Sequence, residues 1–407
     1  MFNVKSVDEV IEIIRSNFSE FELADESVSL NNAVNRILAA DIVSTEDIPG
    51  FNRSSVDGYA VISSDTFGAG DSIPAQLLLT GEVRMGMKPD FALKKGQTAY
   101  VPTGGEIPEN ADAVVMIEYT DNFDDGLIYI NKSVAPGNNI VYKGDDTRAG
   151  NRIIKARQKL RPQDIGALAA LGHNEILVKR KLKVGIVSTG DEVVDIRSKP
   201  TGAQVRDINT YCLYAAIVEY GGEPKPYGIA ADNYEQIREI VKKAAEECDI
   251  VLISGGSSVG TRDETYKVIN SLGAPGILVH GIAIKPGKPT ILGKVNGKAI
   301  FGLPGHPVSA YFIFKIFVAT LMNVKNGVTD KFTKSIQAEL SCNYPSNNGR
   351  EEFVPVRLEE VRGKLVAHPV FGKSGLITVL TTADGYMHIS RGLEGISAGE
   401  MVNVRLL

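Results

Sequence analysis

The sequence predicts a multi-domain protein of the α/β plus β class. From residue 182 to about residue 330, short strand-forming runs alternate with helical segments, which is typical of a doubly wound, mostly parallel sheet with helices on both faces. From residue 331 onward, glycines separate short strand-like runs, which indicates a small C-terminal β-barrel or sandwich. Residues 47–146 have a similar texture, so we expect a second β-rich domain there.

The N-terminal part predicts helices within an elongated, partly extended region. Ser6 and Glu9 have the spacing of a capping box, and apolar residues follow at helical intervals from Val10. A second helix is expected around residues 31–38. A third is expected to begin near Pro162, because proline suits the first turn of a helix.

The alternating segment predicts five strands and four helices. The strands are expected near residues 183–187, 225–229, 249–253, 277–279 and 299–301. The helices are expected over residues 207–220, 234–247, 264–272 and 307–322, with Asp232 as the N-cap of the second. The predicted domains are therefore 1–46 together with 147–181, then 47–146, 182–330 and 331–407.

Composition and charge exclude several classes of protein. The chain has 407 residues, of which 43% are apolar and 23% charged, and this suits a globular protein of several domains. The net charge of −5 argues against general nucleic-acid binding, which leaves a basic footprint. We expect no membrane span, because no apolar run approaches the roughly 20 residues that a bilayer requires. The N-terminus lacks the form of a signal peptide, and Cys212, Cys248 and Cys342 form neither a disulfide framework nor a zinc motif, so the expected location is the cytoplasm.

Unusual polar residues follow each of the five predicted strands. Ligands bind beyond the carboxyl ends of the strands in an open α/β sheet, so these loops should meet at one edge. The most informative loop runs from Ser254 to Asp263, where Gly255 and Gly256 precede a helix and suit an anion. The five loops cover residues 188–192, 230–232, 254–263, 284–289 and 302–307. The sequence therefore predicts a ligand site at this edge.

The residue types in these loops limit the ligand. Lys285 and Lys288 stand in a short turn with proline and glycine, where they form a fixed positive site for an oxyanion or phosphate. The carboxylates of Glu192, Asp232 and Asp263 would repel that anion, so a bound Mg²⁺, a proton-transfer role or hydrogen bonds to a polar heterocycle would explain them. No Cys or His cluster predicts zinc, and no spacing predicts an activated nucleophile. We therefore expect positioning and electrostatic stabilisation rather than covalent catalysis.

The β-rich domain over residues 47–146 has polar corners of its own. Polar turns that contain glycine occur at residues 52–60, 103–105 and 143–146. Each is an ordinary loop by itself. Two β-rich segments that flank an α/β unit nevertheless suggest a cleft between domains or subunits.

Taken in order along the chain, these motifs resemble those of the molybdenum insertase family, the MoeA-type molybdopterin molybdotransferases, to which the C-terminal part of gephyrin is related. The matching segments are residues 55–60 (SVDGYA), 103–105 (TGG), 111–115 (ADAVV), 188–192 (STGDE), 254–263 (SGGSSVGTRD), 285–289 (KPGKP) and 303–309 (LPGHPVS). Several are common turns individually, but the ordered set is specific. The resemblance extends over nearly the whole chain.

The resemblance implies a reaction and an assembly. Members of this family take molybdopterin activated as its adenylate, bind molybdate, insert molybdenum and release AMP, and they depend on a divalent cation, usually Mg²⁺. The family fold is an elongated four-domain homodimer whose active cleft is shared between the α/β domain of one subunit and the second domain of the other. Other enzymes of cofactor biosynthesis are further candidate partners, whereas nucleic acid and membrane are not expected.

The resemblance also assigns roles to individual residues. Catalytic roles fall to Asp57, Thr103, Asp146, Glu192, Asp232 and Asp263, and of these Asp232 and Asp263 would hold the metal. Binding roles fall to Ser254, Gly255, Gly256, Ser257, Ser258, Lys285, Lys288, Pro304, Pro307, Arg350 and Ser374. The loop that begins at Ser254 would hold the pterin phosphate and nucleotide. The residues that would approach molybdate are Lys285, Lys288, Arg350 and Ser374.

Two positions depart from the family pattern. Gly281 stands where many members have lysine, and the loss of one charge-assisted contact would weaken anion binding by about 1.5–3 kcal/mol. His306 stands where the family commonly has asparagine, and an imidazole there would make the site sensitive to pH between about 5 and 8. Both departures leave the choice between molybdate and tungstate open.

Two alternative functions stay open beside the insertase. A molybdopterin adenylyltransferase would share the α/β unit but would usually lack the flanking β-rich domains. A non-catalytic scaffold of the same fold would have lost the acidic and lysine residues of the site, whereas Asp57, Glu192, Asp263, Lys285 and Lys288 are all present. The leading hypothesis is therefore the insertase.

Overall fold

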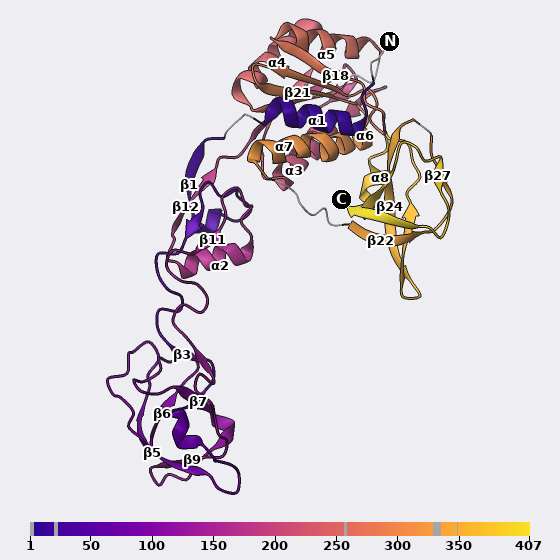
Figure 1. Cartoon of the computed structure of the whole chain (residues 1–407). Coiled ribbons are helices and arrows are strands. Elements are labelled where there is room, and N and C mark those ends of the chain that lie inside the picture. The colour runs from indigo at the N-terminus through magenta and orange to yellow at the C-terminus, as the bar shows by residue number, and fades with distance from the viewer. Residues whose placement is uncertain (1–3, 20–22, 256–258, 329–334, 348) are drawn as a thin grey trace. The chain divides into compact units, whose positions relative to one another are not determined.

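The computed structural model of the chain divides into two compact units (Figure 1). The first unit comprises Met1–Ala39, Arg157–Arg161 and Glu175–Leu407, and the second comprises Ala40–Ala156 and Pro162–Asn174. The described residues are 4–19, 23–255, 259–328, 335–347 and 349–407, without the side chains of 259–263. The finer division into four domains stays a prediction.

The first unit contains a six-stranded sheet in the order β16-β13-β17-β21-β20-β18. Strands β16, β13, β17 and β21 are parallel, whereas β20 runs antiparallel to both β21 and β18. The strands are β13 (Lys183–Thr189), β16 (Glu223–Ala230), β17 (Ile250–Gly255), β18 (Pro275–His280), β20 (Ile291–Val295) and β21 (Lys298–Leu303). The five strands expected from the sequence are all present, and they run in one direction.

Strand β20 is the member of this sheet that the sequence analysis missed. It forms a hairpin with β21, and the turn residues Asn296 and Gly297 have φ angles of 48° and 80°. An Asn-Gly pair between two apolar runs is a strong hairpin signal, because both residues tolerate left-handed backbone. The prediction of repeated strand–helix units did not take this signal into account. Because β20 is antiparallel to its neighbours, the sheet is mixed.

Helices cover both faces of the sheet, as the strand–helix alternation predicts (Figure 1). Helices α4 and α5 pack on one face, around a cluster that includes Val187, Ile237 and Val251. Helices α1, α3 and α6 to α7 belong to the other face, where a larger apolar cluster lies. The bounds are α1 (Val7–Phe18), α3 (Asn209–Glu219), α4 (Tyr234–Glu247), α5 (Val259–Ser271), α6 (Pro307–Ile313), the π-helical turn η4 (Phe314–Val318) and α7 (Ala319–Asn326).

The continuous helix from α6 through α7 is longer than the sequence analysis expected. Over Pro307–Asn326 it is long and apolar enough to cross a membrane by length and composition, so the expectation that no run approaches this length was wrong. However, 67% of its apolar window is buried inside the protein. Phe312, Phe314 and Phe317 lie fully buried in the larger core cluster. Such burial is typical of a core helix.

The N-termini of α1 and α4 show one expectation confirmed and one corrected. At α1, Glu9 N donates to Ser6 Oγ at 3.2 Å and Ser6 N donates to Glu9 Oε2 at 2.7 Å, so the capping box is present. At α4, the N-cap is Asn233 and not Asp232. The side-chain oxygen of Asn233 accepts hydrogen bonds from the backbone N–H groups of Glu235 and Gln236.

The helix expected over residues 31–38 is wrong. Only the 3-10 turn η1 (Leu30–Asn32) forms there, and Asn35 adopts a left-handed φ of 64° that a right-handed helix cannot continue through. Beyond it, Leu38 forms an isolated β-bridge with Val178. The segment therefore runs beside the antiparallel pair β1 (Asp25–Ser29) and β12 (Glu175–Lys179).

The C-terminal part of the first unit is a closed barrel, which confirms the prediction of a small β-barrel. Strands β24, β25, β22, β28 and β26 pair in sequence, and β24 also pairs with β26, so the ring closes. The elements are β22 (Ser335–Leu340), β23 (Tyr344–Pro345), β24 (Glu351–Val361), β25 (Lys364–Pro369), α8 (Thr378–Thr381), β26 (Gly385–Ile389), β27 (Gly395–Ile396) and β28 (Met401–Leu406). The two-residue strand β19 (Ile284–Lys285) pairs with β24 and so joins a loop of the α/β sheet to the barrel.

The second unit is built on a six-stranded sheet in the order β7-β4-β6-β5-β9-β8. Tyr59, Val115 and Ile128 belong to the apolar cluster on one of its faces. Helix α2 begins at Pro162, as expected. The elements are β2 (Ile42–Val43), β3 (Arg53–Ser54), β4 (Gly58–Val61), η2 (Ser63–Thr66), β5 (Ala75–Glu82), β6 (Gln97–Val101), β7 (Ala113–Met116), η3 (Ile117–Tyr119), β8 (Thr120–Asn122), β9 (Leu127–Ile130), β10 (Ile140–Val141), β11 (Arg152–Ile154) and α2 (Pro162–Ala170).

Candidate functional site

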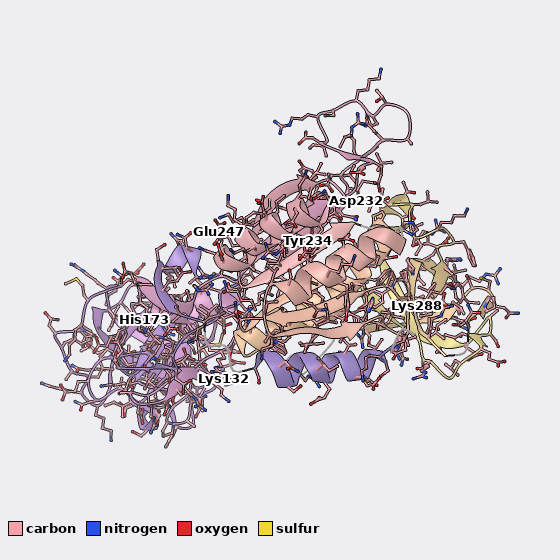
Figure 2. All side chains as sticks on the ribbon, turned by 90° about the horizontal axis from the view of Figure 1, so that it is seen from above. Lys132, His173, Asp232, Tyr234, Glu247 and Lys288 are labelled. Carbon is pink, nitrogen blue, oxygen red and sulfur yellow. The ribbon has the colours of Figure 1, made fainter. Side chains whose placement is uncertain are left out.

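The loops that follow the parallel strands of the first unit come together at one edge of the sheet, here called the carboxyl edge. Gly190 N donates to Ala230 O at 3.2 Å, and Asp232 N donates to Asp191 Oδ1 at 3.1 Å, so the loops after β13 and β16 are joined. Figure 2 shows Asp232 toward this end of the sheet and Glu247, the last residue of α4, toward the other. The geometry of a parallel sheet therefore gathers these loops, as expected.

Strand β17 ends at Gly255, where two backbones approach too closely for a side chain. A Cβ at this position would lie 2.1 Å from the carbonyl oxygen of Thr189 and 2.2 Å from its Oγ1, and the φ angle is +150°. Glycine is therefore required here. Within the described part of the chain, Thr189 Oγ1 is buried without a hydrogen-bond partner.

Asn209, the first residue of α3, ties the end of β17 to the turn after β21. Its Nδ2 donates to Ser254 Oγ and to Gly305 O, both at 2.8 Å. Its Oδ1 is buried and has no hydrogen-bond partner among the residues that the structure describes. In addition to Thr189 Oγ1, the carboxyl edge therefore has a second buried polar atom without a hydrogen-bond partner among the described residues.

Two of the predicted carboxylates belong to loops at the same edge. Asp232 is there, and Glu192 Oε2 lies 2.8 Å from the place where a Cβ on Gly190 would stand. Gly256, Ser257 and Ser258 lie outside the described residues, as does the side chain of Asp263. No group of three or more His, Cys, Asp or Glu side chains that could hold a metal occurs within the described ranges. The donor chemistry still fits Mg²⁺, which prefers carboxylate oxygens.

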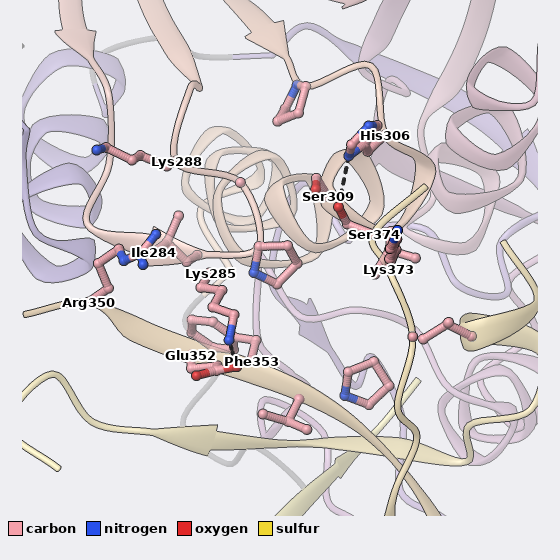
Figure 3. Close-up of a pocket in the computed structure, with 18 of the residues that line it drawn as sticks. Ile284, Lys285, Lys288, His306, Ser309, Arg350, Glu352, Phe353, Lys373 and Ser374 are labelled. Atoms are coloured by element: carbon pink, nitrogen blue, oxygen red, sulfur yellow. Dashed lines mark hydrogen bonds and ion pairs between the residues drawn. The ribbon is translucent and has the colours of Figure 1, made fainter. Parts of the chain in front are cut away.

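A pocket of about 790 Å³ opens between loops of the α/β sheet and the barrel, and we call it the lysine pocket (Figure 3). It brings together five of the predicted site residues, namely Lys285, Lys288, Pro304, Arg350 and Ser374. Pro307 is buried at the start of α6 and does not line it. The remaining lining residues are Ile284, Pro286, Gly287, Pro289, Gly305, His306, Val308, Ser309, Tyr344, Glu352, Phe353, Val354, Pro355, Val370, Phe371, Gly372, Lys373 and Val379.

The cations of the lysine pocket differ in their pairing. Lys285 Nζ lies 2.6 Å from Glu352 Oε1, an ion pair drawn in Figure 3. Lys288, Arg350 and Lys373 form no ion pair with any residue that the structure describes. Several cations without a counter-charge around one concave surface produce a positive potential that attracts an anion.

A hydrogen bond between the two halves of the lysine pocket involves one of the positions that depart from the family pattern. His306 Nδ1 and Ser374 Oγ are 2.8 Å apart, and the imidazole tautomer decides which atom donates. Val308 N donates to the carbonyl oxygen of Ser374 at 3.1 Å. The turn after β21 is therefore held to the barrel loop that carries Ser374.

The other departing position, Gly281, has a local structural reason. Its φ is 94°, a left-handed conformation that a lysine would adopt only under strain. Its carbonyl oxygen accepts a hydrogen bond from Lys5 N at 3.1 Å, and its own N–H donates to Thr290 O at 2.9 Å. The backbone at this position is therefore fixed in a form that favours glycine.

The three predicted residues of the second unit are placed within that unit. Asp57 Oδ1 accepts a hydrogen bond from Thr103 N at 2.8 Å, so these two are neighbours. Asp146 N donates to Ile48 O at 3.0 Å in a separate turn. Their roles in a shared cleft stay predictions.

Sequence reasoning missed several residues of the lysine pocket that come from the barrel. Glu352, Tyr344, Phe371 and Lys373 belong to segments without a recognisable motif. The sequence offered one signal, which was nearness to predicted residues: Glu352 lies two residues after Arg350, and Lys373 directly precedes Ser374. Without the fold, nothing showed that these side chains face the loop of Lys285.

Comparison with known proteins shows the same family along the whole chain. Residues 5–172 match the MoeA N-terminal region (domain I and II), residues 185–323 match the family described as "Probable molybdopterin binding domain", and residues 337–407 match the MoeA C-terminal region (domain IV). The molybdopterin molybdenumtransferase of Bacillus subtilis is 31% identical over 94% of this chain and 90% of that protein. The chain belongs to the molybdopterin molybdenumtransferase family.

Two further comparisons support this assignment to the molybdopterin molybdenumtransferase family. The molybdopterin molybdenumtransferase of Staphylococcus epidermidis is 30% identical over 98% of this chain and 95% of that protein. A crystal structure of the molybdopterin biosynthesis moeA protein from Pyrococcus horikoshii OT3 matches with a TM-score of 0.86 and 33% identity, over 100% of both chains. The family resemblance seen in the sequence is thus confirmed.

Proposed function

We propose that the protein inserts molybdenum, taken from molybdate, into adenylylated molybdopterin and releases AMP during molybdenum cofactor biosynthesis. The observation that carries this proposal is the lysine pocket, which assembles Lys285, Lys288, Arg350 and Ser374 from separate parts of the chain. A tetrahedral oxyanion suits such a set of cationic and hydroxyl donors. The reaction itself is proposed because the chain belongs to the molybdopterin molybdenumtransferase family.

In this proposal, the lysine pocket binds the oxyanion substrate. Lys288 and Arg350 would attract molybdate, since neither is paired with a carboxylate among the described residues. The Ser374 hydroxyl would donate a hydrogen bond when His306 Nδ1 carries a proton and donates to Ser374 Oγ, because the hydroxyl hydrogen is then free to point elsewhere. Charge-assisted hydrogen bonds of this type contribute about 1.5–3 kcal/mol each.

The carboxyl edge would bind the phosphate and nucleotide of the activated pterin. Thr189 Oγ1 and Asn209 Oδ1 are two buried polar atoms that such a ligand could bond to. Asp232, with Glu192 and Asp263, would hold Mg²⁺ there. When bound, Mg²⁺ neutralises phosphate charge and so favours departure of AMP.

The proposal includes a homodimer in the cytoplasm. An exposed apolar stripe on α3 supports a protein contact, because Tyr211, Tyr214 and Val218 are 49%, 44% and 52% exposed on one side of the helix. Ile208 precedes them at a helical interval and is 40% exposed. Light scattering of purified protein tests this point, and a monomer at micromolar concentration would contradict it.

The deciding experiment supplies purified protein with adenylylated molybdopterin, molybdate and Mg²⁺. We expect release of AMP and formation of a cofactor that activates a molybdenum-free apoenzyme. A second arm supplies free molybdopterin and ATP, which an adenylyltransferase would consume. Folded protein that releases no AMP in the first arm refutes the proposal, and ATP consumption in the second arm would favour the adenylyltransferase instead. A protein inactive in both arms would match the scaffold.

A further inference from the structure

Glu352 is the only acidic side chain among the described residues that line the lysine pocket. The side chain is 4% exposed, so its carboxylate is almost fully removed from water. A buried carboxylate is costly unless hydrogen bonds and a counter-charge compensate for the lost hydration. Its presence in a site for an anion therefore requires an explanation.

Three donors hold the Glu352 carboxylate in one orientation. Oε1 accepts from Lys285 Nζ at 2.6 Å and from the Tyr344 hydroxyl at 2.8 Å, and Oε2 accepts from Ser346 Oγ at 2.8 Å. Burial, and then the hydrogen bond to Glu352, raises the pKa of the Tyr344 hydroxyl, so that it stays a donor. The Tyr344 ring stacks on Phe371, with centroids 5.9 Å apart. Both carboxylate oxygens are thus occupied.

The backbone fixes the same pair. Lys285 of β19 and Glu352 of β24 are directly paired in the parallel register that joins the loop to the barrel. The Lys285 side chain lines the lysine pocket and remains 44% exposed, so its pairing with Glu352 does not withdraw it from the pocket. An ammonium group has three N–H donors, and with one directed at Glu352 the remaining two have restricted directions.

We propose that Glu352 is a positioning and selectivity residue for the oxyanion. It directs the free N–H groups of Lys285, and it offsets the charge of that lysine, so that the pocket does not bind every dianion strongly. Selection between molybdate and smaller dianions such as sulfate then depends on hydrogen-bond geometry more than on net charge. This inference rests on the proposed function, in which the lysine pocket binds molybdate.

The test uses Glu352→Gln, with Glu351→Gln as the matched control. Glu351 is the preceding residue and bonds to His388 Nε2 at 2.8 Å, outside the lysine pocket. In Glu352→Gln, we expect sulfate to bind roughly 3- to 10-fold more tightly by calorimetry, because a negative charge near the anion is removed. We expect kcat for AMP release to fall about 10-fold without a rise in the KM for molybdate, because Lys285 loses its fixed direction. The control should match the wild type in both.

A second variant separates charge from position. Tyr344→Phe removes one donor to Glu352 but keeps the charge of the carboxylate and the ion pair with Lys285. We expect a lower kcat without tighter sulfate binding. Circular dichroism and thermal unfolding confirm that each variant is folded.

The outcomes distinguish this inference from the proposed function. Active wild type with Glu352→Gln indistinguishable from Glu351→Gln in sulfate affinity and kcat overturns the inference alone. An equal loss of affinity for sulfate and molybdate in Glu352→Gln overturns it as well. If the wild type releases no AMP but Glu352→Gln still binds sulfate more tightly, the proposed function fails and the control of anion affinity by Glu352 is supported.

Discussion

The two ends of the central sheet are built from the same strands, yet they treat polar groups in opposite ways. At the amino end of β17, Asp249 accepts hydrogen bonds from Arg180 at 2.7 and 2.8 Å and from Lys183 N at 2.8 Å. At its carboxyl end, Thr189 Oγ1 and Asn209 Oδ1 are buried without a partner among the described residues. The Asp249 carboxylate at one end of the strand is thus fully bonded, whereas two buried polar atoms at the other end have no partner among the described residues.

This difference predicts that the amino end of the sheet contributes to stability and the carboxyl end to ligand binding. A saturated ion pair contributes to the folded state but offers nothing to a ligand. Unsatisfied polar atoms and the unpaired cations of the lysine pocket reduce stability in the absence of ligand and become favourable when a ligand binds. Substitutions at the amino end should therefore change unfolding, and those at the carboxyl end and the lysine pocket should change binding.

The largest effect is expected from Asp249→Asn. Although burial acts to raise it, hydrogen bonds from Arg180 and Lys183 N lower the pKa of Asp249 below its usual value. A carboxyl group of this kind stabilises the fold at neutral pH and loses that contribution as the pH falls through its folded pKa. We expect a loss of about 3 kcal/mol in unfolding free energy at pH 7, and a smaller difference from wild type below about pH 4.

Urea unfolding at several pH values measures this effect. The control is Asp195→Asn, which breaks an exposed pair with Arg197 and should change the unfolding free energy far less, because exposed ion pairs contribute little to stability. Molybdate affinity should be unchanged in both variants. A binding defect in Asp249→Asn would show that the two ends of the sheet are not separable.

The next effect is expected from Gly255→Ala at the carboxyl edge. The added Cβ would lie 2.1 Å from Thr189 O, so the backbone must shift, and we expect a loss of about 2–3 kcal/mol together with weaker nucleotide binding. Gly228→Ala is the control, since Gly228 also has a positive φ, of +89°, but nothing lies within 4 Å of its added Cβ. That variant should cost about 1 kcal/mol. Equal losses of stability in the two variants, measured by thermal unfolding, would show that the close approach of Gly255 to Thr189 is not what requires glycine.

A purely binding effect is expected from Lys288→Ala. Loss of one charge-assisted contact of about 1.5–3 kcal/mol should raise the Kd for molybdate roughly ten- to a hundredfold, with a smaller change for the pterin substrate. Lys364→Ala, at a lysine that is 74% exposed on the barrel and absent from the lining of the pocket, provides the control. Calorimetric titration with molybdate and with the pterin substrate measures the two losses of affinity. An equal loss for both ligands would refute the prediction.

The smallest effect is expected from His306→Asn. Asparagine can still bond to Ser374 and is a better N-cap for α6 than histidine, so unfolding free energy should rise by up to about 0.5 kcal/mol. Molybdate affinity should stay within about threefold, because the charged donors of the pocket are unchanged. A tenfold loss of affinity would show that the imidazole contributes directly to anion binding.

The carboxyl edge was predictable from the sequence because its geometry follows from local order. Each loop is adjacent in sequence to a strand, and parallel strands place such loops at one edge, so the positions of Asp232 and Ser254 in the chain were enough to assign them to it. The lysine pocket differs, because Arg350 and Ser374 meet Lys285 only through the docking of the barrel. Those two residues were reached through the family resemblance, and Glu352 and Tyr344, which carry no motif, were missed.

The errors in the fold have physical causes of the same kind. The helix expected over residues 31–38 was inferred from apolar spacing, but left-handed Asn35 and long-range pairing of Leu38 override that local pattern. Strand β20 was missed although the Asn296-Gly297 turn indicates its hairpin. Periodicity was reliable where one element buries one face, and it failed where distant segments supply the pairing.

The pairing of β19 with β24 has a mechanical consequence. Because Lys285 is hydrogen-bonded into the edge of a barrel strand, any rigid rotation of the barrel would carry this lysine with it and alter its distance from Lys288. A truncated chain that ends before the barrel would lose Arg350 and Ser374, and it would also release the loop of Lys285 from its register. The barrel is therefore a component of the lysine pocket, and its attachment sets the spacing of the positive charges there.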